Sequence, residues 1–152
     1  MVGSGEPVLL ISPVLADGFL PLMSQPALTD HYRLIRYHQR GWVGSTHTPP
    51  PVSIEDHAAD AAALLVHLGV RRAHIAGHGN GAAVAAQLTL DHPRTVRTLL
   101  LLELALLSVP SGAAFFQQAG PAFEAFGNGD HEEAFATAAG GEAGKVILHW
   151  RD

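Results

Sequence analysis

The sequence contains no cysteine, a single lysine and few charged residues. The absence of cysteine excludes disulfide bonds and thiolate metal sites. Charged residues make up 15% of the 152 residues and the formal net charge is −5, which argues against a basic surface for nucleic acid. The longest apolar run, residues 99–109, is interrupted by Glu103 and is shorter than the roughly 20 residues that a membrane span requires. No basic region precedes an apolar stretch at the N-terminus, so we expect a cytoplasmic protein without membrane association.

Short apolar runs alternate with amphipathic stretches along the first two thirds of the chain. This alternation is typical of an α/β protein with a parallel sheet and flanking helices. The clearest helix spans residues 53–69, where Ser53 and Asp56 form a capping-box-like start and Gly69 ends the apolar stripe. We predict strands at residues 7–11, 32–37, 73–76 and 96–102, a second helix at 82–90, and a weakly helical stretch at 19–28 that two prolines interrupt.

The most informative segment is Gly77-His78-Gly79-Asn80-Gly81, which joins a predicted strand to a helix of small residues. Its spacing matches the nucleophile elbow G-x-S-x-G, a strained turn that lifts a serine above the sheet. Gly79 occupies the position of the serine, and glycine has no side chain that could attack a substrate. We expect Gly77 and Gly81 to serve packing, because strand and helix approach closely at such a turn.

In its order of motifs, the chain resembles the N-terminal half of the α/β-hydrolase superfamily. The resemblance covers about residues 3–130 and rests on the strand 7–11, the segment Arg40-Gly41-Trp42-Val43-Gly44-Ser45, the helix 53–69 and the elbow. It implies that residues 1–109 form a partial hydrolase-like core and residues 110–152 a helical, cap-like segment that is not an independent domain. The later strands that carry the triad acid and histidine in such proteins have no matching positions in this sequence.

The resemblance also suggests roles for individual residues near the elbow. Glu103 ends a predicted strand where dehalogenase-like relatives place an acid, so it is the candidate acid; a simple capping or ion-pair role is the alternative. His78 is expected to be a packed, hydrogen-bonded pocket residue. Relatives take an oxyanion-binding N–H from the loop after the first strand, where Ser12-Pro13 leaves this role to Val14 or Leu15.

The helix that follows the elbow offers a second anion-binding element. The backbone N–H groups of Asn80 and Gly81 begin this helix, and such helix starts bind anions without any nucleophile. Ten histidines are present, but none form an H-x-x-x-H pair on a predicted helix, so no metal and no cofactor are expected.

These residues support three hypotheses about function. The first is a hydrolase-like pseudoenzyme that binds a small molecule, or acts in an assembly, without serine chemistry. The second is dinucleotide binding, because Gly77, Gly79 and Ala82 satisfy G-x-G-x-x-A and Glu103 follows at a suitable distance. The third is weak hydrolysis by water that Glu103 or a histidine activates.

Phenylalanines are concentrated in the last third of the chain, on predicted helices at 111–126 and 132–139, ahead of a predicted short strand at 145–150. An aromatic surface of this extent on short helices is expected to be buried against another protein surface. We therefore expect a homo-oligomer or a partner chain over these helices, whose phenylalanines are Phe115, Phe116, Phe123, Phe126 and Phe135.

Overall fold

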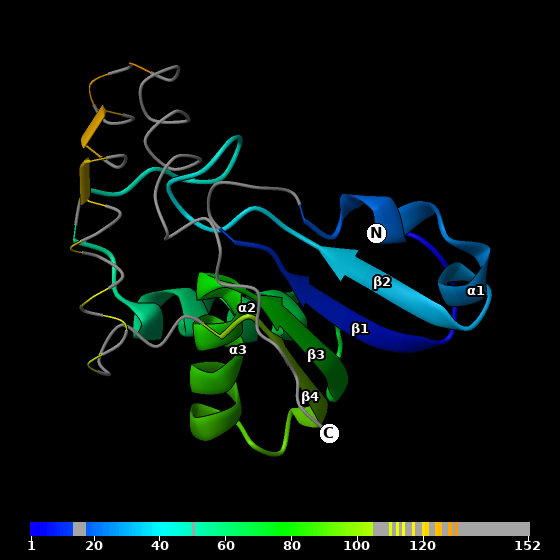
Figure 1. Ribbon diagram of the computed structural model, residues 1–152. Helices are drawn as coiled ribbons and strands as arrows, with labels where there is room; N and C mark the ends of the chain where they lie inside the picture. Colours follow the sequence, from blue (N-terminus) through cyan, green and yellow to red (C-terminus); the bar gives the residue numbers. More distant parts are fainter. Residues whose placement is uncertain are drawn as a thin grey trace. The chain divides into compact units, whose positions relative to one another are not determined.

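Four apolar segments form one parallel sheet, as the sequence predicts (Figure 1). In the computed structural model the strands are β1 (Glu6–Ile11), β2 (Tyr32–Arg36), β3 (Ala73–His78) and β4 (Val96–Leu102). Their order in the sheet is β2-β1-β3-β4, and all three pairings are parallel. The two central strands, β1 and β3, therefore carry their carboxyl ends side by side, which places the loop after β1 next to the predicted elbow.

The structure describes residues 1–13, 18–49 and 51–104, together with scattered positions between 110 and 130. The chain divides into two compact units, Met1–Ala105 and Leu106–Asp152. In the second unit the described positions from 110 to 125 are helical. The predicted helix 132–139, the predicted strand 145–150 and all five phenylalanines of this region lie outside the described residues. The cap-like segment and its partner stay predictions.

Two helices cover one face of the sheet, and the alternation of side chains along β1 shows which face. Leu9 and Ile11 belong to the large core formed with α2 (Ile54–His67) and α3 (Asn80–Asp91), which lie side by side. Leu10 points to the opposite face and joins a smaller core with Phe19 and Leu34. Successive residues of a strand face opposite sides, so β1 is buried by both layers.

The segment predicted as one weak helix at 19–28 is two short elements. A 3-10 helix, η1 (Leu20–Ser24), is followed by α1 (Pro26–Thr29), and Gln25 between them is extended. Pro26 explains the break, because the residue before a proline is disfavoured in helical conformation. Both elements contribute apolar side chains to the smaller core.

The start of α2 is the predicted capping box. The Ser53 hydroxyl accepts a hydrogen bond from the Asp56 N–H (3.1 Å), and the Asp56 carboxylate accepts one from the Ser53 N–H (2.9 Å). The Ser53 N–H and then the Ser53 hydroxyl (3.0 Å), both bonded to the Asp56 carboxylate, hold the pKa of Asp56 below its usual value, because they favour the ionised form. None of the helices in the described part of the chain is long and apolar enough to cross a membrane.

Strand β4 lies at one edge of the sheet. Within the described residues it pairs only with β3. Its side chains are mostly exposed: Leu99 is 37% exposed, Leu100 54% and Leu102 39%. The edge therefore combines unpaired backbone groups with apolar side chains, a combination that favours association.

Candidate functional site at the elbow

The glycine-rich turn, predicted over residues 77–81, is a single residue in the structure. Strand β3 continues to His78 and α3 begins at Asn80, so Gly79 alone reverses the chain direction, with φ of 59° and ψ of −124°. The Gly79 N–H donates to the Leu102 carbonyl (3.0 Å), and its carbonyl accepts from the Ala82 N–H (3.1 Å). Such a tight strand-to-helix turn is the geometry of a nucleophile elbow.

The two flanking glycines permit this turn for steric reasons, as predicted. A Cβ atom on Gly77 would overlap the Gly81 carbonyl oxygen and lie 2.6 Å from the Cα of Ala82. A Cβ atom on Gly81 would overlap the Ile11 carbonyl oxygen and lie 2.8 Å from that of Ser12. The start of α3 therefore contacts the backbones of both β1 and β3. The turn extends over fewer residues than predicted because Gly77 belongs to the strand and Gly81 to the helix.

The nucleophile position has room for a side chain. Among the described residues, which do not include 14–17, a Cβ atom on Gly79 would meet only the Cβ of Pro13, at 3.4 Å, which is an ordinary contact. The backbone, in contrast, is strained for any residue other than glycine, since φ is positive. The described residues therefore leave space for a serine side chain at this position.

His78 and Glu103, two of the predicted site residues, are in direct contact. The His78 Nε2 and the Glu103 Oε2 atoms are 2.6 Å apart, and the residues come from the ends of the neighbouring strands β3 and β4. An ionised Glu103 would fix the ring proton on Nε2 and leave Nδ1 as a hydrogen-bond acceptor. The His78 ring also makes an edge contact with Phe19, at a centroid distance of 6.3 Å. The prediction of a packed, hydrogen-bonded histidine agrees with these contacts.

Glu103 adopts an unusual backbone conformation, with φ of 49°. Positive φ is uncommon for residues other than glycine and often marks a functional position. The side chain is 70% exposed, so its hydrogen bond to His78 is open to solvent and contributes little to stability. The strained backbone and the contact together direct this carboxylate toward the elbow. Its role as a catalytic acid stays a prediction.

The loop after β1 is anchored to the loop after the neighbouring strand β2. Gln39 is 5% exposed, and its Nε2 donates to the Ser12 carbonyl (2.8 Å), which ties the loop after β2 to the loop after β1. Val14 and Leu15, the predicted oxyanion donors, lie outside the described residues. Asn80 and Gly81 are the first two residues of α3, where a helix has no preceding turn to accept from its N–H groups. Gln39 was not predicted from the sequence, which offers no pattern that distinguishes it from other loop residues.

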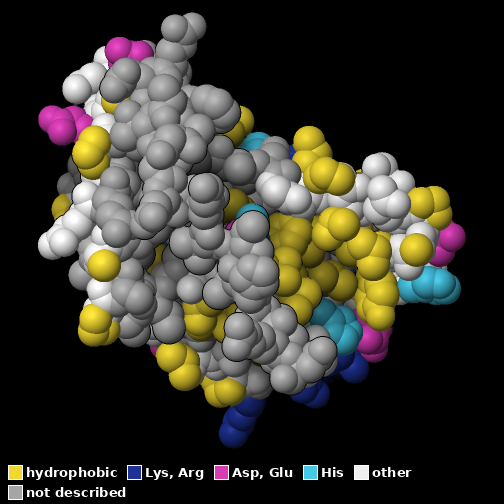
Figure 2. Space-filling model, viewed as in Figure 1, with side chains coloured by type: hydrophobic (Ala, Val, Ile, Leu, Met, Phe, Trp, Pro, Cys, Tyr) yellow, Lys and Arg dark blue, Asp and Glu magenta, His cyan; other side chains and the backbone are white. Residues whose placement is uncertain are grey.

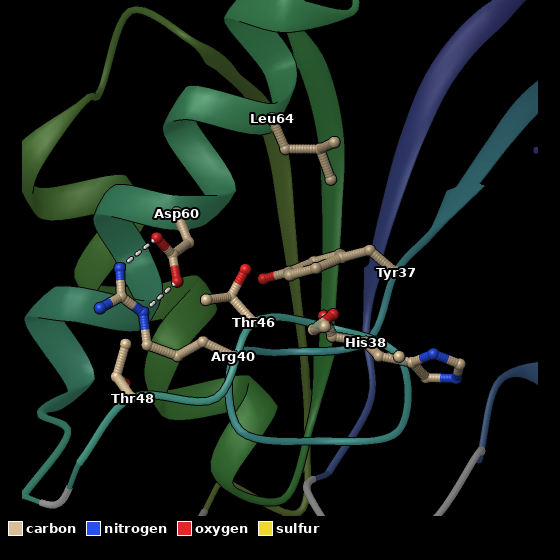
Figure 3. Close-up of a pocket in the computed structure, with 9 residues that line it drawn as sticks. Tyr37, His38, Arg40, Thr46, Thr48, Asp60 and Leu64 are labelled. Atoms are coloured by element: carbon tan, nitrogen blue, oxygen red, sulfur yellow. Dashed lines mark hydrogen bonds and ion pairs between the residues drawn. The ribbon is translucent and has the colours of Figure 1, made fainter.

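A cavity lies between the loop after β2 and helix α2 (Figure 3). Its volume is about 500 Å³. Arg40 donates from Nε to Asp60 Oδ2 (2.6 Å) in a two-bond ion pair that joins the loop to α2. The Tyr37 hydroxyl is directed toward the side of the cavity where Thr46 and Asp60 lie, and burial, followed by the Asp60 charge, raises the pKa of Tyr37. The Arg40–Asp60 pair thus fixes the Arg-Gly-x-x-Gly-Ser segment quoted above.

The described residues contain no group of histidine and carboxylate side chains arranged to hold a metal ion. Among the described residues, the chemical groups at the elbow are backbone amides, one histidine and one carboxylate. Such a set can bind an oxyanion or a carboxylate and can exchange a proton, but it offers no nucleophile at Gly79.

Comparison with known proteins decides the family. The family model described as "alpha/beta hydrolase fold" matches residues 8–145 of this chain. The chain belongs to the α/β-hydrolase family. The elbow, the parallel sheet and the flanking helices agree with this membership. A solved hydrolase from Pseudomonas aeruginosa PA01 has a similar fold, with a TM-score of 0.67 and 27% sequence identity. The match covers 80% of this chain and 46% of that chain.

Curated relatives in the α/β-hydrolase family carry the names of hydrolytic enzymes. A protein from Stutzerimonas stutzeri named as a carbamate hydrolase, RutD, is 37% identical over 98 residues, which are 62% of this chain and 36% of the relative. A fluoroacetate dehalogenase from Burkholderia sp is 30% identical over 110 residues, which are 67% of this chain and 35% of the relative. The chain spans about a third of the length of these relatives.

Proposed function

We propose that this chain is an α/β-hydrolase-type domain that binds a small carbonyl or carboxylate compound at the elbow without forming a covalent intermediate. One observation carries the proposal: the elbow keeps its turn and its helix start, while the position of the nucleophile holds Gly79. Covalent catalysis in this fold begins with attack by the side chain at that position. Without it, binding and stabilisation of negative charge are the functions that the turn can still perform.

The ligand class follows from the groups present and from the relatives. The N-terminal amides of α3, at Asn80 and Gly81, favour an oxygen atom with negative charge or a polarised carbonyl oxygen. Relatives are named for a carbamate and for fluoroacetate, which are small compounds with a carbonyl or carboxylate group. A compound of this class, such as methyl carbamate or acetate, would place its oxygen at the start of α3.

The decisive experiment compares the parent chain with Gly79→Ser and Gly79→Ala. The alanine variant is a matched control, because it shares the backbone strain and the added Cβ with the serine variant but lacks the hydroxyl. We expect the parent and Gly79→Ala to give neither turnover of activated esters nor covalent labelling by a fluorophosphonate probe. Covalent labelling at the elbow of the parent would contradict the proposal, and ester turnover without labelling would favour hydrolysis by activated water.

Binding is measured separately, from amide chemical shifts in NMR spectra during titration with methyl carbamate and with acetate. We expect saturable shifts at Asn80 and Gly81 in the parent chain. Unchanged amides at the start of α3 over the whole titration would refute the binding part of the proposal, whatever the result with the esters.

Dinucleotide binding is a second candidate that one observation favours. The unit β3–α3–β4 is parallel, opens its helix at the G-x-G-x-x-A sequence and ends with Glu103, as in dinucleotide-binding units. In the structure, however, the Glu103 carboxylate is hydrogen-bonded to His78. Titration with NAD distinguishes the two candidates, because only dinucleotide binding predicts that NAD binds saturably and that Glu103→Gln weakens this binding.

A further inference from the structure

Positive charge is concentrated at the end of the sheet opposite the elbow. Five arginines line one cavity of about 590 Å³, and each lies at or just before the start of a strand. Lys and Arg side chains gather at the lower edge of the view in Figure 2. The whole sequence holds nine lysines and arginines and a net charge of −5, so more than half of its positive side chains surround this one cavity: Arg33, Arg71, Arg72, Arg94 and Arg97.

The parallel topology explains why these arginines meet. The amino ends of parallel strands share one edge of the sheet, so arginines near the starts of β2, β3 and β4 come together although they are far apart in the sequence. Arg97 occupies an irregularity in β4: Ala73 pairs with Val96 and His74 pairs with Thr98, which leaves Arg97 as the extra residue. Such bulges redirect a side chain and occur preferentially near functional sites.

Only part of this charge is compensated within the described residues. Arg97 Nη1 lies 3.2 Å from the Glu6 carboxylate, and Arg72 Nη2 donates to the Val96 carbonyl at 3.4 Å. The Nε atom of Arg33 is buried and has no hydrogen-bond partner in the described structure. A buried donor without a partner is uncommon in native structures. The cluster therefore combines mutual repulsion with an unused donor.

We propose that this cavity, the arginine site, binds a small polyanion with several phosphate groups. Guanidinium groups present pairs of parallel N–H donors that match phosphate oxygens, and several such groups around one concavity favour a ligand with several phosphates. The volume lies within the range of small-molecule sites. The ligand would reduce the repulsion among the like-charged guanidinium groups around the cavity, and thereby stabilise the folded chain.

The arginine site is independent of the function proposed for the elbow. Gly79 lies at the carboxyl end of β3, whereas Arg71 and Arg72 directly precede the amino end of the same strand. A phosphate compound at this end would not contact the elbow. The two proposals can therefore fail separately.

The test uses inorganic triphosphate as the probe, with calorimetric titration and thermal unfolding of the full chain. We expect saturable binding and a rise in Tm. In the double variant Arg71→Gln/Arg94→Gln the affinity should fall by about tenfold or more, as expected when charge-assisted hydrogen bonds are lost. Arg36→Gln is the control for the single variant Arg71→Gln, because it also removes one positive charge, but from the opposite end of β2, where Arg36 contacts His38. This control should bind triphosphate as the parent does.

Each further outcome bears on the proposal. Equal affinity of ATP and triphosphate would support recognition of the phosphate groups themselves. Sulfate at matched ionic strength should bind more weakly than triphosphate, and equal binding would reduce the site to non-specific charge attraction. Tighter binding of a single-stranded oligonucleotide would overturn the proposal in favour of a nucleic-acid surface. An unchanged affinity in the double variant would also overturn it.

Discussion

Substitution of Gly77 by alanine should loosen the elbow by forcing α3 away from β3. The added Cβ would overlap the Gly81 carbonyl oxygen and lie 2.6 Å from the Ala82 Cα, and both are backbone atoms that no change of rotamer can move. Forcing an extra methyl group into packed structure costs about 1–3 kcal/mol. That is a large share of the roughly 5–15 kcal/mol that stabilises a typical domain. We expect the free energy of unfolding to fall by this amount.

Two other glycines separate steric overlap from backbone strain. Gly44 has open space around it and no positive φ, so Gly44→Ala should leave stability unchanged or raise it by about 0.4–1 kcal/mol. Gly69 also has open space but a φ of 67°, so Gly69→Ala should show the cost of strain alone, about 1–2 kcal/mol. Urea denaturation followed by circular dichroism measures all three. If Gly77→Ala is as stable as Gly44→Ala, close backbone approach is not the reason for glycine at this position.

Three further predictions concern the helix α2 and the end of β4. Ser53→Ala removes the acceptor for the Asp56 N–H and should lower stability by about 0.5–2 kcal/mol in thermal unfolding, while Ser53→Thr keeps the cap and should change little. Burial lowers the pKa of His57, so the imidazole takes up a proton more readily in the unfolded chain than in the folded one. The free energy of unfolding should therefore fall as the pH decreases below about 6.5. In His57→Gln the urea midpoint should depend less on pH over the same range. Glu103→Gly and Glu103→Ala both remove the contact with His78, but only glycine relieves the positive φ, so the glycine variant should be more stable by about 1 kcal/mol or more. A lower Tm for Glu103→Gly than for Glu103→Ala would contradict the assignment of strain.

The sequence predicts the sheet well because its strands are short segments rich in aliphatic and aromatic residues, separated by helix starts and stops. Ser53 and Gly69 mark the ends of α2, and the structure places the helix between them. The turn was predicted too long, because glycines are typical of loops, whereas the packing role expected for Gly77 and Gly81 agrees with the structure. Here Gly77 and Gly81 lack side chains so that strand and helix backbones can touch.

The site could be predicted only in part, because contacts between strands depend on register. His78 and Glu103 are far apart in sequence, yet His78 pairs in register with Leu102 next to Glu103. The prediction placed both residues at the elbow but did not pair them. The arginine site was missed because a net charge averages over the whole chain. Arginines at the starts of three predicted strands were the pattern that could have revealed it.

The exposed edge at β4 has a practical consequence for the behaviour of the protein in solution. Four consecutive leucines, residues 99–102, lie there between Arg97 and Glu103, the nearest charges on either side. Charged residues that flank an apolar strand discourage the stacking of identical strands from different molecules. The tendency of the purified chain to precipitate should therefore depend on these two charges. Leu100→Lys, which places a charge in the middle of the run, should increase the concentration at which the chain stays clear.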